Sequence, residues 1–161
     1  MIHDYGVAIE EPAGWHTRIV KIVAPIESPV MLHIATVPVA TSDYSFYQYE
    51  LCNSLGPNDA AIIAIIHAPD EVRSSTVVRD FSKFAFAVAD YVTIQGLPRG
   101  QVQARRVLTV HNRECELVGC FGTTNPSATL LHAMTTSLRT LEVSPSSAKK
   151  SDGHGQEVSL A

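Results

Sequence analysis

Apolar residues along the chain alternate with polar ones in some stretches and recur at helical spacing in others. Alternation, with many branched side chains, predicts strands at residues 5–9, 17–23 and 30–37, each bounded by proline or glycine. Residues 60–67 are instead an almost continuous apolar run between turn residues. Such a run predicts a central strand that is buried on both faces of its sheet.

Two stretches carry the apolar period of a helix. In the first, apolar side chains recur every three or four positions across residues 44–55, and Gly56 then ends the pattern. In the second, Asn125 and Pro126 predict an N-cap followed by proline at the first helical position. The apolar stripe then continues across residues 126–139.

Residues 70–98 fit two periods. Phe84, Phe86 and Val88 alternate as in a strand, but Phe84 and Val88 also fit a helix together with Phe81. Both interpretations stay open at this point, and we favour extended structure.

A β-hairpin across residues 104–121 is the clearest local prediction. Its turn is placed at Asn112-Arg113, because asparagine tolerates the positive φ of a type I′ turn, and Val110 then lies opposite Cys115. This register gathers apolar side chains on one face and polar ones on the other, so the pattern and the turn agree. The apolar face holds Leu108, Val110, Cys115 and Leu117, and the polar face holds Thr109, His111, Glu114 and Glu116.

These elements predict an α+β domain, in which helices pack on an antiparallel β-sheet. Residues 1–143 form that single domain in this interpretation, and residues 141–143 return as a short strand to the sheet edge. Residues 144–161 are rich in serine and lack any apolar period, which predicts a disordered tail.

Composition and charge narrow the possible partners. The chain has 161 residues, of which 45% are hydrophobic, enough to bury a core without a metal or a disulfide. Its formal net charge of −4 argues against nucleic acid and against an anionic bilayer, because both attract basic surfaces. The longest unbroken apolar run, Ala60–Ile66, is much shorter than a membrane-spanning helix.

Three local patterns resemble the small PsbP-like (Mog-type) domains. The strand that begins at Tyr5, followed by Pro12-Ala-Gly-Trp15, is similar to the opening strand and the P-x-G-W turn of that family. Residues 46–66, with a helix, Gly-Pro-Asn-Asp and a strand, are similar to small bacterial proteins of this kind, and so are residues 112–143.

The resemblance covers residues 1–143 and implies an α/β/α sandwich around an antiparallel sheet. Characterised relatives are accessory proteins, such as photosystem subunits, a Ran-binding factor and mycobacterial lipoproteins, and they usually catalyse no reaction. Several bacterial relatives are exported or lipid-anchored. This chain opens without a leader or a lipobox cysteine, so we expect a cytoplasmic protein. No binding motif of a characterised member is matched, so the family assigns no functional residue.

Catalytic motifs are missing from the sequence. It contains no G-x-S-x-G, Walker A, G-x-G-x-x-G or H-E-x-x-H pattern. Cys52, Cys115 and Cys120 form no CxxC pair, which predicts three small buried thiols in a reducing compartment rather than a zinc site. Cys52 could form a disulfide with either of the others, which the sequence leaves open, and Cys120 as a nucleophile is the less favoured interpretation.

Two further features have both a functional and a structural interpretation. His33, His67 and His111 would form a metal site if the fold brought them together, but none shares ligand spacing with another. Scattered histidines are the favoured interpretation, and no metal or cofactor is predicted. The GxxG from Gly119 to Gly122, before a helix start, would offer backbone amides to an anion, but simple helix capping explains it better.

Arginine residues supply the functional hypothesis. Arg99, Arg105 and Arg106 lie in a stretch without acidic residues, in a chain that is acidic overall. Arg105 and Arg106 point to opposite faces of their strand, which argues against a single patch, and a solvated basic edge is the favoured interpretation. An acidic partner would be drawn to such an edge. These arginines and Trp15 are the predicted partner-binding residues.

The sequence therefore predicts a non-enzymatic accessory or protein-interaction module that binds an unidentified protein, with an acidic contact face. The alternative is a small-molecule-binding protein or an enzyme with a pocket between sheet and helices. A deep apolar pocket with convergent histidine, cysteine or arginine side chains would favour this alternative.

Overall fold

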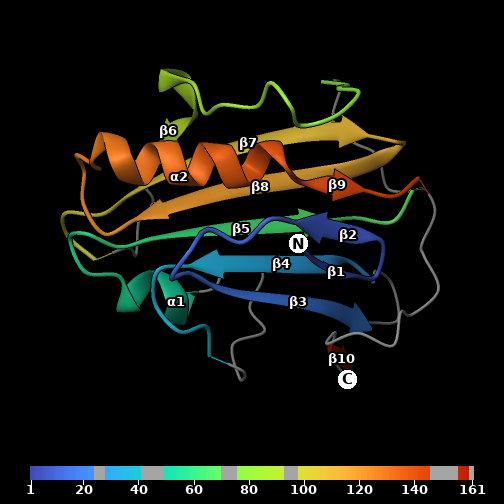
Figure 1. Cartoon of the computed structure of the whole chain (residues 1–161), viewed down its shortest axis with the longest axis horizontal. Helices are drawn as coiled ribbons and strands as arrows, with labels where there is room; N and C mark the ends of the chain where they lie inside the picture. The colour runs from blue at the N-terminus through green and yellow to red at the C-terminus, as the bar shows by residue number, and fades with distance from the viewer. Residues whose placement is uncertain (24–27, 41–48, 70–75, 93–97, 146–155, 160–161) are drawn as a thin grey trace.

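The computed structural model describes residues 1–23, 28–40, 49–69, 76–92, 98–145 and 156–159. The strands of its large sheet are β3 (His16–Val23), β4 (Val30–Ala35), β5 (Ala60–Ile66), β6 (Tyr91–Val92), β7 (Val102–Val110), β8 (Arg113–Phe121) and β10 (Gln156–Ser159). Their spatial order is β10-β3-β4-β5-β8-β7-β6 (Figure 1). Neighbouring strands are antiparallel, except that β10 runs parallel to β3.

A second sheet lies over one face of the large sheet. Its strands are β1 (Ile2–Asp4), β2 (Val7–Ile9) and β9 (Glu142–Val143), in the order β1-β2-β9. The tight β1–β2 hairpin forms because Tyr5 and Gly6 both take positive φ, 47° and 76°, as a type I′ turn requires. Helix α2 (Ala128–Arg139) lies beside the small sheet, over β7 and β8 (Figure 1).

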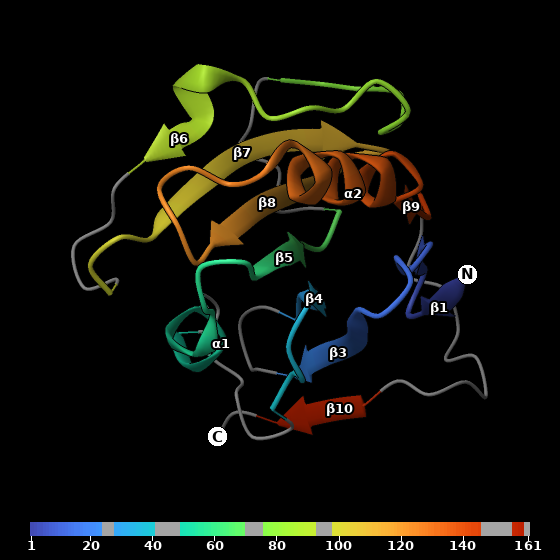
Figure 2. The same cartoon turned by 60° about the vertical axis from the view of Figure 1, so that its left-hand side comes forward.

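The three central strands of the large sheet, β4, β5 and β8, are buried along their whole length. The central strand predicted at residues 60–67 is therefore confirmed as β5. On the first face, its side chains pack under the small sheet and α2. On the second face, they pack under Leu51, Cys52 and Leu55, in and just after the short helix α1 (Tyr49–Ser54). Figure 2 shows α1 and the small sheet on opposite sides of the large sheet.

The predicted α+β sandwich is wrong, because the protein is mostly β. Among the described residues, α2 is the only helix of more than eight residues. The helix predicted over residues 44–55 is described only as α1, and residues 44–48 lie outside the described residues. The N-terminal apolar residues pair with each other and with β9, so a small sheet covers much of the face where helices were expected. The same observation overturns the α/β/α sandwich that the family resemblance implies.

The β7–β8 hairpin turns one residue earlier than predicted. His111 and Asn112 take positive φ, 47° and 62°, and Val110 therefore lies opposite Arg113. Arg113 opens β8 instead of entering the turn, and its Nε donates to the carbonyl oxygen of His67 at 2.9 Å. Because the partner strand slips by two residues, every strand residue keeps its face. The predicted apolar face is confirmed, while His111 belongs to the turn.

Helix α2 begins two residues after the predicted start. Ser127 is its N-cap, and the Ser127 hydroxyl accepts a hydrogen bond from the backbone N–H of Leu130 at 3.2 Å. Asn125 and Pro126 therefore belong to the preceding turn.

The C-terminal segment departs from the predicted disorder at four residues. Gln156–Ser159 form β10, in parallel register with residues 20–23 of β3. Residues 146–155 and 160–161 lie outside the described residues. Strand pairing uses main-chain N–H and C=O groups, which nearly every residue carries. The pairing of β10 could therefore not be predicted from the hydrophobic pattern.

Glycine substitutions distinguish the observed turn from the predicted one. His111→Gly removes a side chain from positive φ and should raise the free energy of unfolding by up to about 1 kcal/mol. Arg113→Gly should lower it, because it deletes the hydrogen bond to His67 and leaves the space of a buried side chain empty. Denaturant midpoints of both variants measure these effects. A gain in stability for Arg113→Gly would contradict the observed register.

Candidate functional site

Residues 76–90, which we call the strap, lie beside β7 and close the edge of the first face. At one end the strap is joined to β7 by two main-chain hydrogen bonds with Thr109. Further along, Phe81 and Phe84 enter the core and are 1% and 6% exposed. The Nε of Arg139, in the last turn of α2, donates to the carbonyl oxygen of Phe84 at 2.9 Å. The strap is thus fixed from both β7 and α2.

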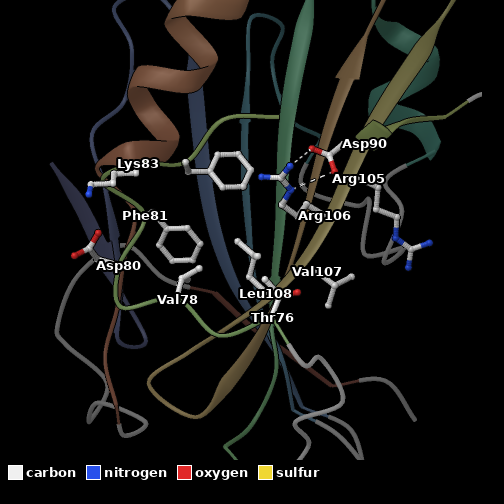
Figure 3. Close-up of a pocket in the computed structure, with 11 residues that line it drawn as sticks. Thr76, Val78, Asp80, Phe81, Lys83, Asp90, Arg105, Arg106, Val107 and Leu108 are labelled. Carbon is white, nitrogen blue, oxygen red and sulfur yellow. Dashed lines mark hydrogen bonds and ion pairs between the residues drawn. The ribbon is translucent and has the colours of Figure 1, made fainter. Parts of the chain in front are cut away.

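An open groove of about 570 Å³ lies between the strap and β7 (Figure 3). Its volume is within the range of small-molecule sites. Unlike the pocket considered from the sequence, it lies beside the sheet edge and not between sheet and helices. The apolar lining comes from Val78, Phe81, Phe84 and Leu108, and the charged lining includes Asp80, Lys83, Asp90 and Arg106.

Arg106 fastens the strap to β7 and is fully engaged in doing so. Its Nη2 and Nε lie 2.6 and 3.2 Å from the two carboxylate oxygens of Asp90, and its Nη1 donates to the carbonyl oxygen of Ala85 at 2.8 Å. The guanidinium carbon also lies 5.5 Å from the centre of the Phe84 ring, in a cation–π contact. Its charge is therefore already balanced where it faces the groove (Figure 3).

The structure does not bring the four predicted partner-binding residues together. Arg105 points to the opposite side of β7 from Arg106, as the alternation predicts, and its Nε lies 2.7 Å from a carboxylate oxygen of Glu116. Arg99 is exposed in the turn before β7. Trp15 is half-buried in the turn before β3 and packs against the first-face core. No single basic surface results from these four side chains.

Removing Arg106 should loosen the strap. Arg106→Met deletes two hydrogen bonds and the ion pair, and leaves Asp90 partly buried without its cation, so the free energy of unfolding should fall by about 1–3 kcal/mol. Hydrogen exchange of strap amides should become faster at the same time. Arg99→Met, at an exposed arginine, should change stability by less than about 0.5 kcal/mol. Equal stability of the two variants would show that the ion pair does not hold the strap.

Cys52 and Cys120 meet on the second face of the sheet. Their Sγ atoms are 2.8 Å apart, both residues are buried, and the Nε2 of Gln103 lies 3.5 and 3.3 Å from the two sulfurs. The Nε2 of Gln101 donates to the carbonyl oxygens of Cys52 and Leu55, at 2.9 and 3.3 Å. Two glutamines of the β7 edge thus hold α1 and its C-terminal end against the sheet.

Burial makes the thiols poor nucleophiles. The hydrogen bond with Cys52, and then burial, raise the pKa of Cys120 well above its usual value. Burial raises the pKa of Cys115, on the other face, to about 12. Since the thiolate is the reactive form of cysteine, both thiols stay protonated and unreactive at neutral pH. The cysteines are buried as predicted.

His33 lies on the second face, in a cross-strand row between Arg18 of β3 and Ile63 of β5. It is 1% exposed, and neither ring nitrogen has a hydrogen-bond partner among the described residues. Burial, and then the nearby charge of Arg18, lower the pKa of His33 from 6.5 to about 3. The imidazole is therefore neutral in the folded protein at physiological pH.

His33 should make the fold sensitive to acid. Its pKa is near 6.5 in the unfolded chain and about 3 in the folded one, so the unfolded state binds the extra proton between these values. Stability should fall as the pH drops from about 6.5 towards 3, by on the order of 5 kcal/mol in total. His33→Leu should lose this part of the pH dependence. Parallel stability curves for the two proteins would contradict the assignment.

The histidines do not converge. His33 lies in β4, His67 directly follows β5, and His111 lies in the β7–β8 turn. Within the described ranges, no group of three histidine, cysteine, aspartate or glutamate side chains could hold a metal ion. No helix in the same part of the chain is long and apolar enough to cross a membrane.

Both glycines of the GxxG motif have a packing role. A Cβ on Gly122 would lie 1.8 Å from the carbonyl oxygen of Gly56, so only glycine allows this close approach of the two backbones. A Cβ on Gly119 would lie 3.0 Å from Phe86 and 3.1 Å from Met134. The motif is thus explained by contacts between β8 and its covers.

Sequence reasoning missed the strap as a site, because its residues follow no single period. Two signals were present. Phe81 and Phe84 are three residues apart, and Asp80 and Ser82 beside Phe81 are residue types that favour turns. In the structure, the Oδ1 of Asp80 accepts a hydrogen bond from the backbone N–H of Ser82 at 2.9 Å.

Comparisons with protein-family models, with curated proteins and with solved structures find no match to this chain. The PsbP-like resemblance therefore stays a prediction. Function has to be argued from the geometry of the chain itself.

Proposed function

We propose that the protein is a non-enzymatic protein-interaction module, which binds its partner along the β7 edge of the large sheet, around the groove. The supporting observation is the position of the exposed valines. Val77, Val88 and Val92 are 74%, 91% and 38% exposed. Val77 lies opposite Thr109, near one end of β7, and Val92 lies opposite Gln103, near the other. Paired residues share a face of the sheet, so Val77 and Val92 lie on the Thr109 and Gln103 side of the β7 edge, at the two ends of the groove. A partner seated along this edge would cover them.

The charges around the groove indicate what kind of partner fits. Arg106 is paired with Asp90, and Arg105 is paired with Glu116. An acidic partner would gain little from charges that are already balanced. We therefore favour a protein that inserts an apolar side chain, such as leucine or phenylalanine, and contacts the flanking valines. Its association should depend only weakly on ionic strength.

A second candidate is a small-molecule-binding protein, favoured by the volume of the groove, about 570 Å³. An apolar ligand would contact Phe81, Phe84 and Leu108. Such a ligand would not need the valines outside the groove, and this difference separates the two functions.

Aspartate substitutions at the edge test the proposal. The double variant Val77→Asp/Val88→Asp changes two highly exposed side chains, so its stability should stay within about 1 kcal/mol of wild type. Capture of the specific partner from a lysate, quantified by mass spectrometry, should fall at least about tenfold. Val23→Asp is the matched control, at a 37% exposed valine of β3, which β4, β5 and β8 separate from β7.

Equal capture by wild type, the double variant and Val23→Asp would contradict the proposal. A small molecule that binds wild type and the double variant with equal affinity would support the second candidate instead.

A further inference from the structure

Arg113, the first residue of β8, is a buried arginine without a counter-charge. It is 3% exposed. Its Nε donates to the carbonyl oxygen of His67 at 2.9 Å, whereas its Nη1 is buried and has no hydrogen-bond partner. Among the described residues, no carboxylate forms an ion pair with it. Its buried charge is uncompensated by the described part of the chain.

This charge cannot be removed by titration. Burial lowers the pKa of Arg113 below its usual value, but a guanidinium stays protonated at every physiological pH. Proteins compensate a buried charge by placing an opposite charge beside it, because an unpaired buried ion is strongly destabilising. The missing opposite charge has to come from outside the described residues.

A cavity of about 220 Å³ lies in front of Arg113. It is separate from the groove, and it lies on the first face near the turn of the β1–β2 hairpin. This volume is below the range of drug-sized ligand sites but is several times the volume that one molecule occupies in liquid water. The residues that line it are Arg113, Lys21, Tyr5, Ser28, Val30, Ala68 and Pro69.

Lys21 brings a second positive charge to the same cavity. Lys21 of β3 lies opposite Val30 of β4, and that row continues through Ile66 to Cys115, two residues from Arg113. Both cations therefore lie on one face of the sheet. The hydroxyl-bearing Tyr5 and Ser28 add hydrogen-bonding groups, and no carboxylate of the described residues lines the cavity.

We propose that this cavity binds an oxyanion of the phosphate class, held by the guanidinium of Arg113 and the ammonium group of Lys21. A guanidinium offers two parallel N–H donors to adjacent phosphate oxygens, and an ammonium neutralises further charge as a point cation. A doubly charged tetrahedral ion matches two cations from separate strands better than a singly charged carboxylate does. The site is independent of the function proposed for the β7 edge.

Titration calorimetry of the full chain with inorganic phosphate, against sodium chloride at the same ionic strength, tests this site. Phosphate should bind saturably and raise the thermal midpoint, because a ligand of the folded state stabilises it. Arg113→Met should weaken phosphate binding at least about tenfold, and Lys21→Met should weaken it by about three- to tenfold. Arg99→Met is the matched control, since it removes an exposed arginine, and should bind like wild type.

Stability without phosphate provides a second readout. Arg113→Met removes an uncompensated buried charge, and this gain offsets part of the loss from the packing and the hydrogen bond that the arginine makes, so the thermal midpoint in chloride should fall only slightly. Phosphate should no longer raise the thermal midpoint of this variant. If Arg113→Met does not fold, Lys21→Met, at a half-buried position, carries the test. Phosphate binding that is unchanged in Lys21→Met, or no phosphate effect beyond that of chloride, would overturn the proposal.

Two further titrations define the ligand. If phosphoserine binds at least about tenfold tighter than inorganic phosphate, the ligand is a phosphate monoester. If inorganic phosphate binds tighter than phosphoserine, the ligand is the free ion. Acetate that binds as tightly as phosphate would overturn the phosphate class.

Discussion

The three central strands are apolar on both faces, so other parts of the chain have to shield both faces of the sheet from water. β4, β5 and β8 expose almost nothing, and the described part of the chain has one helix of more than eight residues to lay over them. The first face is covered by the small sheet, α2 and the strap, and α1 packs on the second. These covers are short, so burial alone gives each of them little stability. Their positions depend on polar contacts made at the edges.

β7 contributes polar contacts to covers on both sides, because its side chains alternate between the two faces. Gln103 reaches the thiols of the second face, and Gln101, just before the strand, reaches the end of α1. Arg106 points to the first face and binds the strap through Asp90 and Ala85. The groove lies where the strap leaves β7 between its attachments. The groove therefore results from the way in which the strap is attached to β7.

The same dependence explains which parts could be predicted from sequence. The faces of the β7–β8 hairpin were correct even though the turn was misplaced, because a slip of two residues keeps the alternation. The strap was not predictable from periodicity, since Phe81 and Phe84 are anchored from a turn. The sequence shows that arginines are frequent in residues 99–106, but the carboxylate partners of Arg105 and Arg106 are distant in sequence or on another strand. Asp90 and Glu116 could be assigned to Arg106 and Arg105 only with the register in hand.

His33 and Arg113 are two of the buried polar side chains with a nitrogen that has no hydrogen-bond partner among the described residues, and they differ in a way that decides their meaning. His33 can remain neutral, so its burial costs only the hydrogen bonds that its nitrogens do not make. At a pH above about 6.5, histidine is neutral in the unfolded chain as well, so this burial adds no penalty for losing a proton. Arg113 has no neutral form at these pH values, so its burial leaves a full charge to be balanced. An imidazole in this state needs no ligand, whereas a guanidinium in this state needs an anion. A cavity that also contains Lys21 and lacks any described carboxylate supplies the space for one.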